Sequence, residues 1–386
     1  MYRCSILFRW VEDGVPVEHF LEIVPLKATD ARTIYSALVK FMKDKNIQIS
    51  KLVGMGFDGT ATCSGKHNGV QSLLKKNSPH AVFVHCHCHL LQLACVQTAN
   101  AINGIKHVYI TLTTLWKFFH YSPKRAKCLK EVQRVLDLPE LKIVKPSDTR
   151  WLAHERCVKA VKASYSAIVN ALNNIYEQTH EPEALGLSKA LCKPSTVCAM
   201  YLLDYALPQV AKLSRSLQTE KIDLTVIARL VDATLNTLDD AILPAANWVL
   251  ELLDAKDDLE AATDVEITTA IITSFQERVA KTFVMMLKAN IPSRFVSQDV
   301  VFSFSIFDPE KVPAADSSDL LHYGEDSVDL LFAHYGADQP ANTVDGVEYT
   351  KKALISPDIW KTFRSYLSKQ PKGTLYSQLT ELTHHK

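Results

Sequence analysis

The chain of 386 residues carries a formal net charge of +1, and 47% of its residues are apolar and 22% charged. This balance is typical of a globular protein with room for two or more domains, and it gives no overall charge argument for a nucleic-acid partner. No apolar run approaches the ~20 residues of a membrane span, and the first residues lack the apolar core of a signal peptide. Nine cysteines without regular spacing favour an intracellular, reducing compartment over a disulfide scaffold.

The first 85 residues predict a mixed α/β arrangement. Two β-prone segments flank an Asp13-Gly14 turn signal, so residues 2–26 are expected to form a hairpin. Thr29 or Asp30 then caps a helix whose apolar residues recur at helical spacing. We expect one mixed sheet, with a helix at 66–77 and strands at 2–10, 18–25, 52–57 and 81–85.

Beyond about residue 87 the pattern becomes helical, and Pro208 and Pro244 are expected to mark bends or boundaries. Long amphipathic segments are expected at 87–119, 123–137, 151–178, 195–217, 223–240, 245–262 and 267–289. Residues 291–350 are typical of a loosely ordered acidic connector with short elements such as 325–335, and a last helix is expected at 357–369. The domains predicted are 1–120, 121–290 and 291–386.

Charge is distributed unevenly along the helical part. Residues 121–162 hold eleven Lys and Arg against five Asp and Glu, whereas residues 232–266 hold ten acids against one Lys. Such asymmetry indicates one basic and one acidic face, although solvated helix surface explains it equally well.

Asp58 stands directly after the strand expected at 52–57, and the glycines Gly59, Gly65 and Gly69 follow it. In open α/β sheets, ligands and catalytic groups gather beyond the carboxyl ends of the strands. A carboxylate is also the kind of hard oxygen ligand that Mg²⁺ prefers. Asp58 is therefore a candidate metal ligand, and the alternative is that it caps the helix that follows.

The string HCHCH occupies residues 85–89, at the end of the strand expected at 81–85. Alternate side chains of a strand point to opposite faces, so these histidines and cysteines are not expected to converge on one ion. No second Cys/His pair lies at zinc-finger spacing, which argues against a structural zinc site.

Two further patterns suit nucleic acid. In Thr149-Arg150-Trp151, Arg150 offers bidentate hydrogen bonds to phosphate and Trp151 a stacking face for an unpaired base. The alternative is that Trp151 anchors a helix and that Arg150 pairs with a nearby acid.

Lys124, Arg125 and Lys127 begin a cationic helix face that continues to Lys130 and Arg134. Such a face can meet phosphates without reading base sequence, and solvated surface is again the alternative.

These blocks occur in the order and approximate spacing of the catalytic-domain signature of hAT-superfamily DNA transposases, which the sequence resembles. More narrowly, it resembles the zinc-finger-fused, transposase-derived proteins of animal genomes. The resemblance covers residues 1–160 well, and continues to about residue 290 by helical texture alone. It implies an α/β plus all-α fold in which an incomplete RNase H-like core with a mixed sheet precedes a large helical insertion domain. It also implies a nuclear protein that binds DNA.

The resemblance assigns roles to single residues. Asp58 matches the second acid of the family's Asp-Asp-Glu triad, which holds two Mg²⁺ or Mn²⁺ ions. Cys86 and His89 match the family's C-x-x-H block, whose histidine helps to handle the DNA end. Arg150 and Trp151 match its T-R-W block, which serves DNA hairpin handling.

The other two acids of the triad are not found. The family's first Asp lies upstream of the block matched at residues 7–21, and Glu381 lacks the sequence context of the third acid. We therefore expect a chain truncated at both ends, with at most weak divalent binding at Asp58, no bound cofactor and no catalytic activity. Two alternatives stay open: a fragment of an active transposase that uses Mg²⁺ or Mn²⁺, and a protein-interaction scaffold that uses the acidic helices of 232–266.

Overall fold

The structure is a computed structural model that describes residues 2–13, 15–146, 151–219, 226–295, 299–307, 311, 313, 317–336, 339–344 and 347–351. Two compact units divide the chain. Unit 1 comprises residues 1–89, 220–226 and 296–386, and unit 2 comprises residues 90–219 and 227–295. Packing alone does not tell which parts fold independently, so the three predicted domains stay a prediction. Among the described residues, no helix is long and apolar enough to cross a membrane.

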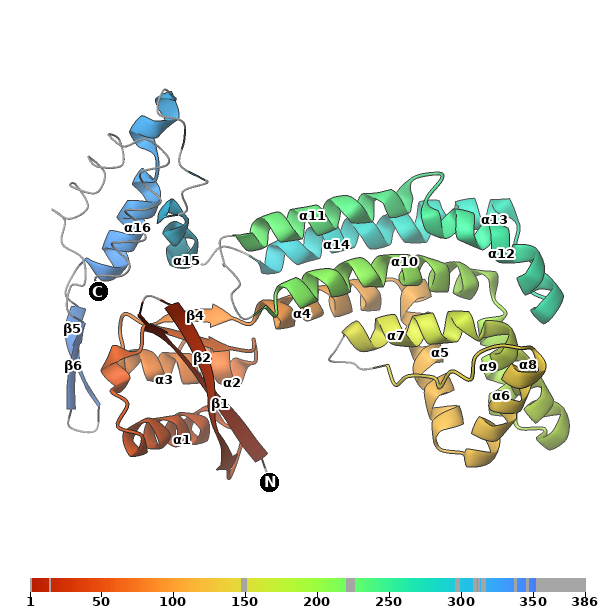
Figure 1. Ribbon diagram of the computed structural model, residues 1–386, viewed down its shortest axis with the longest axis horizontal. Coiled ribbons are helices and arrows are strands. Elements are labelled where there is room, and N and C mark those ends of the chain that lie inside the picture. The colour runs from red at the N-terminus through yellow and green to blue at the C-terminus, as the bar shows by residue number, and fades with distance from the viewer. Residues whose placement is uncertain are drawn as a thin grey trace. The chain divides into compact units, whose positions relative to one another are not determined.

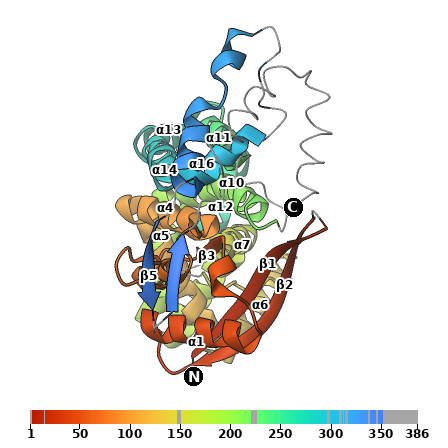
Figure 2. The same ribbon diagram turned by 90° about the vertical axis from the view of Figure 1, so that its left-hand side faces the viewer.

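Unit 1 opens with the predicted hairpin, in which β1 (Tyr2–Glu12) pairs antiparallel with β2 (Val15–Leu26). Asp13 adopts the left-handed conformation that a tight hairpin turn requires. Helix α1 (Ala31–Asp44) follows and lies against the hairpin (Figure 1, Figure 2). Its N-cap is Asp30, whose side chain accepts a hydrogen bond from the Thr33 N–H at 3.0 Å.

A second pair of strands follows, with β3 (Gly54–Phe57) parallel to β4 (Val82–His85). A parallel pair needs a crossover, and the chain makes it through the short α2 (Ala61–Ser64) and through α3 (Val70–Asn77). A 3₁₀ turn, η1 (Ile49–Lys51), precedes β3.

The single four-stranded sheet expected from the sequence is wrong for the described residues, because β1 pairs with β2 and β3 with β4 in two separate sheets. The two pairs nevertheless share one hydrophobic core, to which β1 contributes Ile6, β3 contributes Met55 and β4 contributes Phe83. Phe41 of α1 and Leu74 of α3 complete the centre of this core. Alternating polarity predicts a strand and its buried face, but it does not specify which strand lies at its edge.

Unit 2 is helical, as predicted, but two expected helices are interrupted. The segment 87–119 breaks at Ile102, and the segment 151–178 breaks at Ser164, each of which leaves helical backbone geometry. Pro208 lies inside a continuous helix rather than at a boundary. The helices are α4 (His87–Ala101), α5 (Asn103–His120), α6 (Pro123–Val135), α7 (Trp151–Ala163), α8 (Tyr165–Thr179), α9 (Pro182–Leu191), α10 (Pro194–Ser216), α11 (Ile227–Asp239), α12 (Asn247–Thr263), α13 (Thr269–Phe275) and α14 (Lys281–Arg294).

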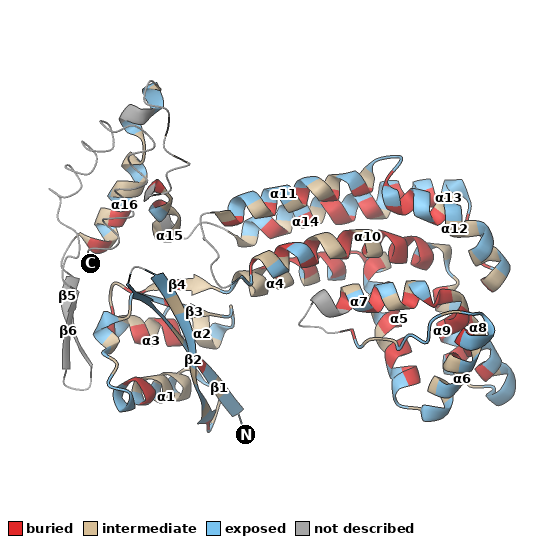
Figure 3. Ribbon diagram, in the orientation of Figure 1, coloured by how far each residue is buried: buried red, intermediate tan, exposed pale blue. Residues whose placement is uncertain are grey.

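The core of unit 2 is centred on α10, which is buried over most of its length (Figure 3). The 3₁₀ turn η3 (Asp240–Ile242) precedes α12, and the π-helical η4 (Gln276–Ala280) joins α13 to α14. Trp248 of α12 is fully buried and donates its indole N–H to the Ala241 carbonyl at 2.8 Å.

The remainder of unit 1 contains more regular structure than an acidic connector. The helix predicted at 325–335 is present as α16 (Glu325–Tyr335), and the strands β5 (Gln339–Val344) and β6 (Val347–Lys351) were not expected. Shorter elements are α15 (Asp299–Ser303), η5 (Phe304–Phe307) and η7 (Ser318–His322). The helix predicted at 357–369 and Glu381 lie outside the described residues.

Candidate functional site

Asp58 lies at the carboxyl end of β3, as predicted, and its side chain is exposed. Its Oδ1 accepts hydrogen bonds from the Thr60 hydroxyl at 2.7 Å and from the Thr60 N–H at 3.2 Å. Thr60 is the N-cap of α2, so the Asp58 carboxylate closes the turn before this helix without being its cap. The pKa of the neighbouring Cys63 thiol is raised, mainly by burial and further by the Asp58 carboxylate.

Two histidines lie beside this turn. His85 ends β4 directly opposite Phe57, and His89 lies in the first turn of α4. A Cβ atom on Gly59 would lie 3.3 Å from Cδ2 of His89 and 3.4 Å from Nδ1 of His85, so both rings pack against the backbone next to Asp58. The predicted proximity of Asp58 and His89 is therefore confirmed.

His85 is the site residue that sequence reasoning missed. Burial lowers its pKa, the neighbouring His89 lowers it further, and the Asp58 carboxylate opposes both effects. Its Nδ1 is buried and has no hydrogen-bond partner among the described residues. The signal was present in the sequence, because His85 ends the strand next to the one that Asp58 follows.

The donors around Asp58 do not fit a two-metal site. Two Mg²⁺ or Mn²⁺ ions in a nuclease core require several carboxylates, whereas the side chains beside Asp58 are imidazoles and a thiol. Within the described part of the chain, no group of three or more His, Cys, Asp or Glu side chains is arranged to hold a metal ion. This donor set therefore supports no catalytic step through a metal.

The glycines that follow Asp58 bring two backbone segments together. The Gly69 N–H donates to the Gly65 carbonyl at 3.0 Å, which closes the connection between α2 and α3. The Gln71 side chain donates to the Ser64 carbonyl at 2.6 Å, and the Ser64 hydroxyl donates to the Thr60 carbonyl at 2.9 Å. These bonds fix the turn that carries Asp58.

The predicted cations of α6 differ in their surroundings. Lys124 and Lys127 are exposed, and Lys127 forms an open ion pair with Glu131 at 3.7 Å. Lys130 and Arg134 both pair with Glu140, at 3.6 Å and 2.6 Å. Much of the predicted cationic face thus carries its own counter-charge.

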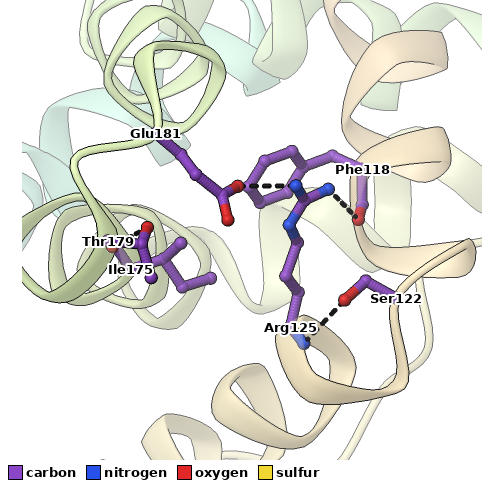
Figure 4. A network of polar contacts seen from close by, with 6 residues as sticks. All are labelled: Phe118, Ser122, Arg125, Ile175, Thr179 and Glu181. Carbon is purple, nitrogen blue, oxygen red and sulfur yellow. Dashed lines mark hydrogen bonds and ion pairs between the residues drawn. The ribbon is translucent and has the colours of Figure 1, made fainter.

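Arg125 is held inside unit 2 (Figure 4). Its guanidinium lies 4.0 Å from the Phe118 ring centroid, donates to the Phe118 carbonyl at 3.3 Å and pairs with Glu181 at 2.6 Å. These contacts tie α5, α6 and the residue before α9 together. They occupy the guanidinium, and its predicted contact with DNA stays a prediction.

The junction of α5 and α6 presents an exposed basic and aromatic surface, which we call the α5–α6 corner and define as Lys117, Tyr121, Lys124 and Lys127. Tyr121 is 72% exposed, and its ring contacts His120 and Trp116 of the preceding helix turn. Sequence reasoning identified the two lysines of α6 but missed Lys117 and Tyr121. Arg150 and the side chain of Trp151 lie outside the described residues, so their predicted roles stay predictions.

One comparison with known proteins bears on this site. Residues 2–69 match the protein-family model DUF4371, described as "ZMYM1/FAM200, RNase-like domain". The match covers the hairpin, α1, β3 and the turn of Asp58, and it ends at Gly69 before His85 and His89. Residues 2–69 of this mixed α/β chain are therefore similar to a family of RNase-like domains.

Proposed function

We propose that this protein derives from a hAT-type DNA transposase, no longer cleaves DNA, and acts in the nucleus by binding DNA or chromatin. The observation that carries the proposal is the position of Asp58, at the carboxyl end of β3 and within the segment that matches an RNase-like domain. His89 lies beside it, where the C-x-x-H block of the resemblance would place a histidine that handles a DNA end.

The loss of cleavage follows from the donor set. In a two-metal mechanism, one ion activates the attacking oxygen and the other stabilises the leaving oxygen, and carboxylates hold both ions. Asp58 is one carboxylate, and its Oδ1 already accepts two hydrogen bonds from Thr60. We infer that the RNase-like unit keeps the shape of a nuclease core without its metal ligands.

Metal binding and strand cleavage test this inference directly. Calorimetric titration with Mn²⁺ or Mg²⁺ is expected to reveal no site tighter than the millimolar range, and supercoiled plasmid is expected to remain unnicked. Asp58→Asn keeps an oxygen for Thr60 but removes the charge, so it is expected to match the unsubstituted protein in both assays. Micromolar Mn²⁺ binding or nicking that Asp58→Asn abolishes would instead support the active-transposase alternative.

The α5–α6 corner supports the DNA-binding part of the proposal. Its exposed lysines suit phosphates, and the exposed ring of Tyr121 suits stacking on an unpaired base. Such contacts bind nucleic acid without reading its sequence, and their strength falls steeply with salt.

Salt-dependent DNA binding provides the matching measurement. Removing both Lys124 and Lys127 by alanine substitution is expected to weaken binding to duplex of any sequence and to reduce the log–log salt slope by about 2, because each phosphate that the protein no longer neutralises lowers the slope by about 0.9. Tyr121→Ala is expected to weaken single-stranded DNA binding more than duplex binding.

The matched control for the charge removes Lys256 and Lys281, which are partly exposed lysines elsewhere on unit 2. This double alanine variant loses the same net charge away from the α5–α6 corner, so its slope is expected to stay unchanged. Equal effects in the two double variants, or no binding at low salt, would argue against this surface as the DNA-binding site.

A protein-interaction scaffold is the second candidate, and one observation favours it. The acidic segment 232–266 exposes two large apolar residues, Leu243 at 52% and Leu250 at 47%. Acidic side chains around exposed leucines suit a basic amphipathic partner. If the DNA-binding test fails, this surface becomes the better functional candidate.

A further inference from the structure

Helix α4 begins beside two cysteines that are separated by one residue. Cys86 directly precedes the helix and is exposed, whereas Cys88 is half-buried in its first turn, and both are free thiols. The Cys88 thiol hydrogen-bonds to the Cys86 sulfur, and the backbone N–H groups of His89 and Cys88 do the same. The Cys86 sulfur thus lies at the positive end of a fifteen-residue helix with a second thiol beside it.

These contacts make Cys86 unlike the other thiols of the protein. The pKa of Cys86 is lowered to about 6, first by the hydrogen bond from Cys88 and then by the two N–H groups, against the opposing effect of burial. Burial raises the pKa of the other cysteines whose shift is resolved, namely Cys4, Cys63, Cys95, Cys128, Cys157, Cys192 and Cys198. Cys86 is therefore both an exposed thiol and one that is stabilised as a thiolate.

We propose that Cys86 and Cys88 form a peroxide-reactive redox pair at the start of α4. The Cys86 thiolate attacks one oxygen of a hydroperoxide and breaks the O–O bond, and with one proton taken up this yields a sulfenic acid and water or an alcohol. The Cys88 sulfur then attacks the sulfenic sulfur and displaces water, which closes a Cys86–Cys88 disulfide. The thiols lose two electrons in total, and the hydroperoxide gains them.

The positions of the two residues allow this closure. Because they are two positions apart in the chain, their Cα atoms are separated by at most about 7 Å, and disulfides span Cα distances of about 4.4–6.8 Å. Cys86 lies outside the helix, and the first N–H groups of a helix have no intrahelical partner, so adjustment there breaks no helical hydrogen bond. His89 directly follows Cys88, so the same adjustment would also shift the ring that packs on Gly59.

This redox pair goes beyond the proposed function, since it requires neither a metal at Asp58 nor DNA. Its first test is alkylation of the native protein by iodoacetamide, followed cysteine by cysteine with peptide mass spectrometry. Cys63 is the matched control, because it is also partly exposed in unit 1 but its pKa is raised.

The expected alkylation rate of Cys86 is half-maximal near pH 6 and constant above about pH 7, whereas that of Cys63 still rises at pH 9. At pH 7 we expect Cys86 to react roughly four- to tenfold faster, because its larger thiolate fraction is partly offset by the lower nucleophilicity of a less basic thiolate. A Cys86 profile that follows that of Cys63 would overturn the proposal.

The second test exposes the protein to hydrogen peroxide. The expected product is an intramolecular Cys86–Cys88 disulfide that dithiothreitol reverses, identified by fragmentation that separates it from the buried Cys95. Cys88→Ser keeps a hydrogen-bond donor beside Cys86, so dimedone is expected to trap a sulfenic acid at Cys86. In Cys86→Ser, Cys88 is expected to remain a thiol. Oxidation of Cys88 in that variant, or disulfides formed only with other cysteines, would contradict the assigned order.

Discussion

Gly69→Ala is expected to destabilise unit 1 by about 2–3 kcal/mol, because the new methyl group has no space. A Cβ atom on Gly69 would lie 2.6 Å from the Gly65 carbonyl oxygen and 2.8 Å from the Gly65 Cα. These are backbone atoms, which cannot swing aside as the end of a flexible side chain can. The connection between α2 and α3 must therefore open, and the hydrogen bond from the Gly69 N–H to Gly65 is strained or broken.

The measurement is urea denaturation combined with native-state hydrogen exchange, which reports the two units separately. Peptides of β3 and α3 are expected to lose protection, whereas peptides of α10 in unit 2 keep it. Gly186→Ala is the matched control, because a Cβ there meets nothing within 4 Å and the residue lies inside α9. That substitution is expected to stabilise unit 2 by about 0.5–1 kcal/mol. Unchanged stability of Gly69→Ala would show that the two glycine backbones do not meet.

The effect on the candidate site distinguishes a local from a global change. The turn of Asp58 depends on this connection, since Gln71 holds the Ser64 carbonyl and Ser64 in turn holds that of Thr60. A displaced α2 therefore moves Thr60, the hydrogen-bond partner of Asp58.

Local patterns in the sequence predicted the parts of the fold that short-range chemistry determines. The Asp13-Gly14 signal identified the hairpin, and the spacing of Asp30 and Thr33 explains where α1 begins. The proximity of Asp58 and His89 followed from strand order, because the carboxyl ends of parallel strands meet at one edge of a sheet.

Pairings between distant segments were beyond the sequence. The separation of the β1–β2 pair from the β3–β4 pair depends on which strand edges meet, and alternating polarity does not encode that. The breaks at Ile102 and Ser164 depend on how each helix packs, because neither position carries proline or glycine.

The candidate site divided in the same way. Its strand-end residues were predictable, and the low pKa of Cys86 follows from its place just before a helix, a position that the sequence also indicated. Arg125 was interpreted by its neighbours along α6, whereas its main partner, Glu181, is 56 residues away in sequence. Charge patterns along one helix cannot reveal a counter-charge that another segment supplies.

Arg125→Ala is expected to destabilise unit 2 by about 2–4 kcal/mol. The substitution removes a charged hydrogen bond to Glu181, worth about 1.5–3 kcal/mol, and a cation–π contact with Phe118, worth about 0.5–2 kcal/mol. Both partners are only about one-third exposed or less, with side-chain exposures of 26% for Arg125 and 33% for Glu181. Urea denaturation measures the change in stability, and Lys124→Ala on the exposed side of the same helix is expected to alter it by less than about 0.5 kcal/mol.

Glu181→Gln separates a structural role of Arg125 from a role in DNA binding. It keeps the size of the side chain but removes the counter-charge, so it is expected to destabilise unit 2 and to show strong coupling with Arg125→Ala in a double-mutant cycle. If Arg125 is structural, DNA binding by the folded variant is unchanged within error. If the released guanidinium instead meets phosphate, Glu181→Gln binds duplex more tightly and with a salt slope that is steeper by about 0.9, the value for one further neutralised phosphate. That outcome would assign Arg125 to the DNA-binding surface together with Lys124 and Lys127.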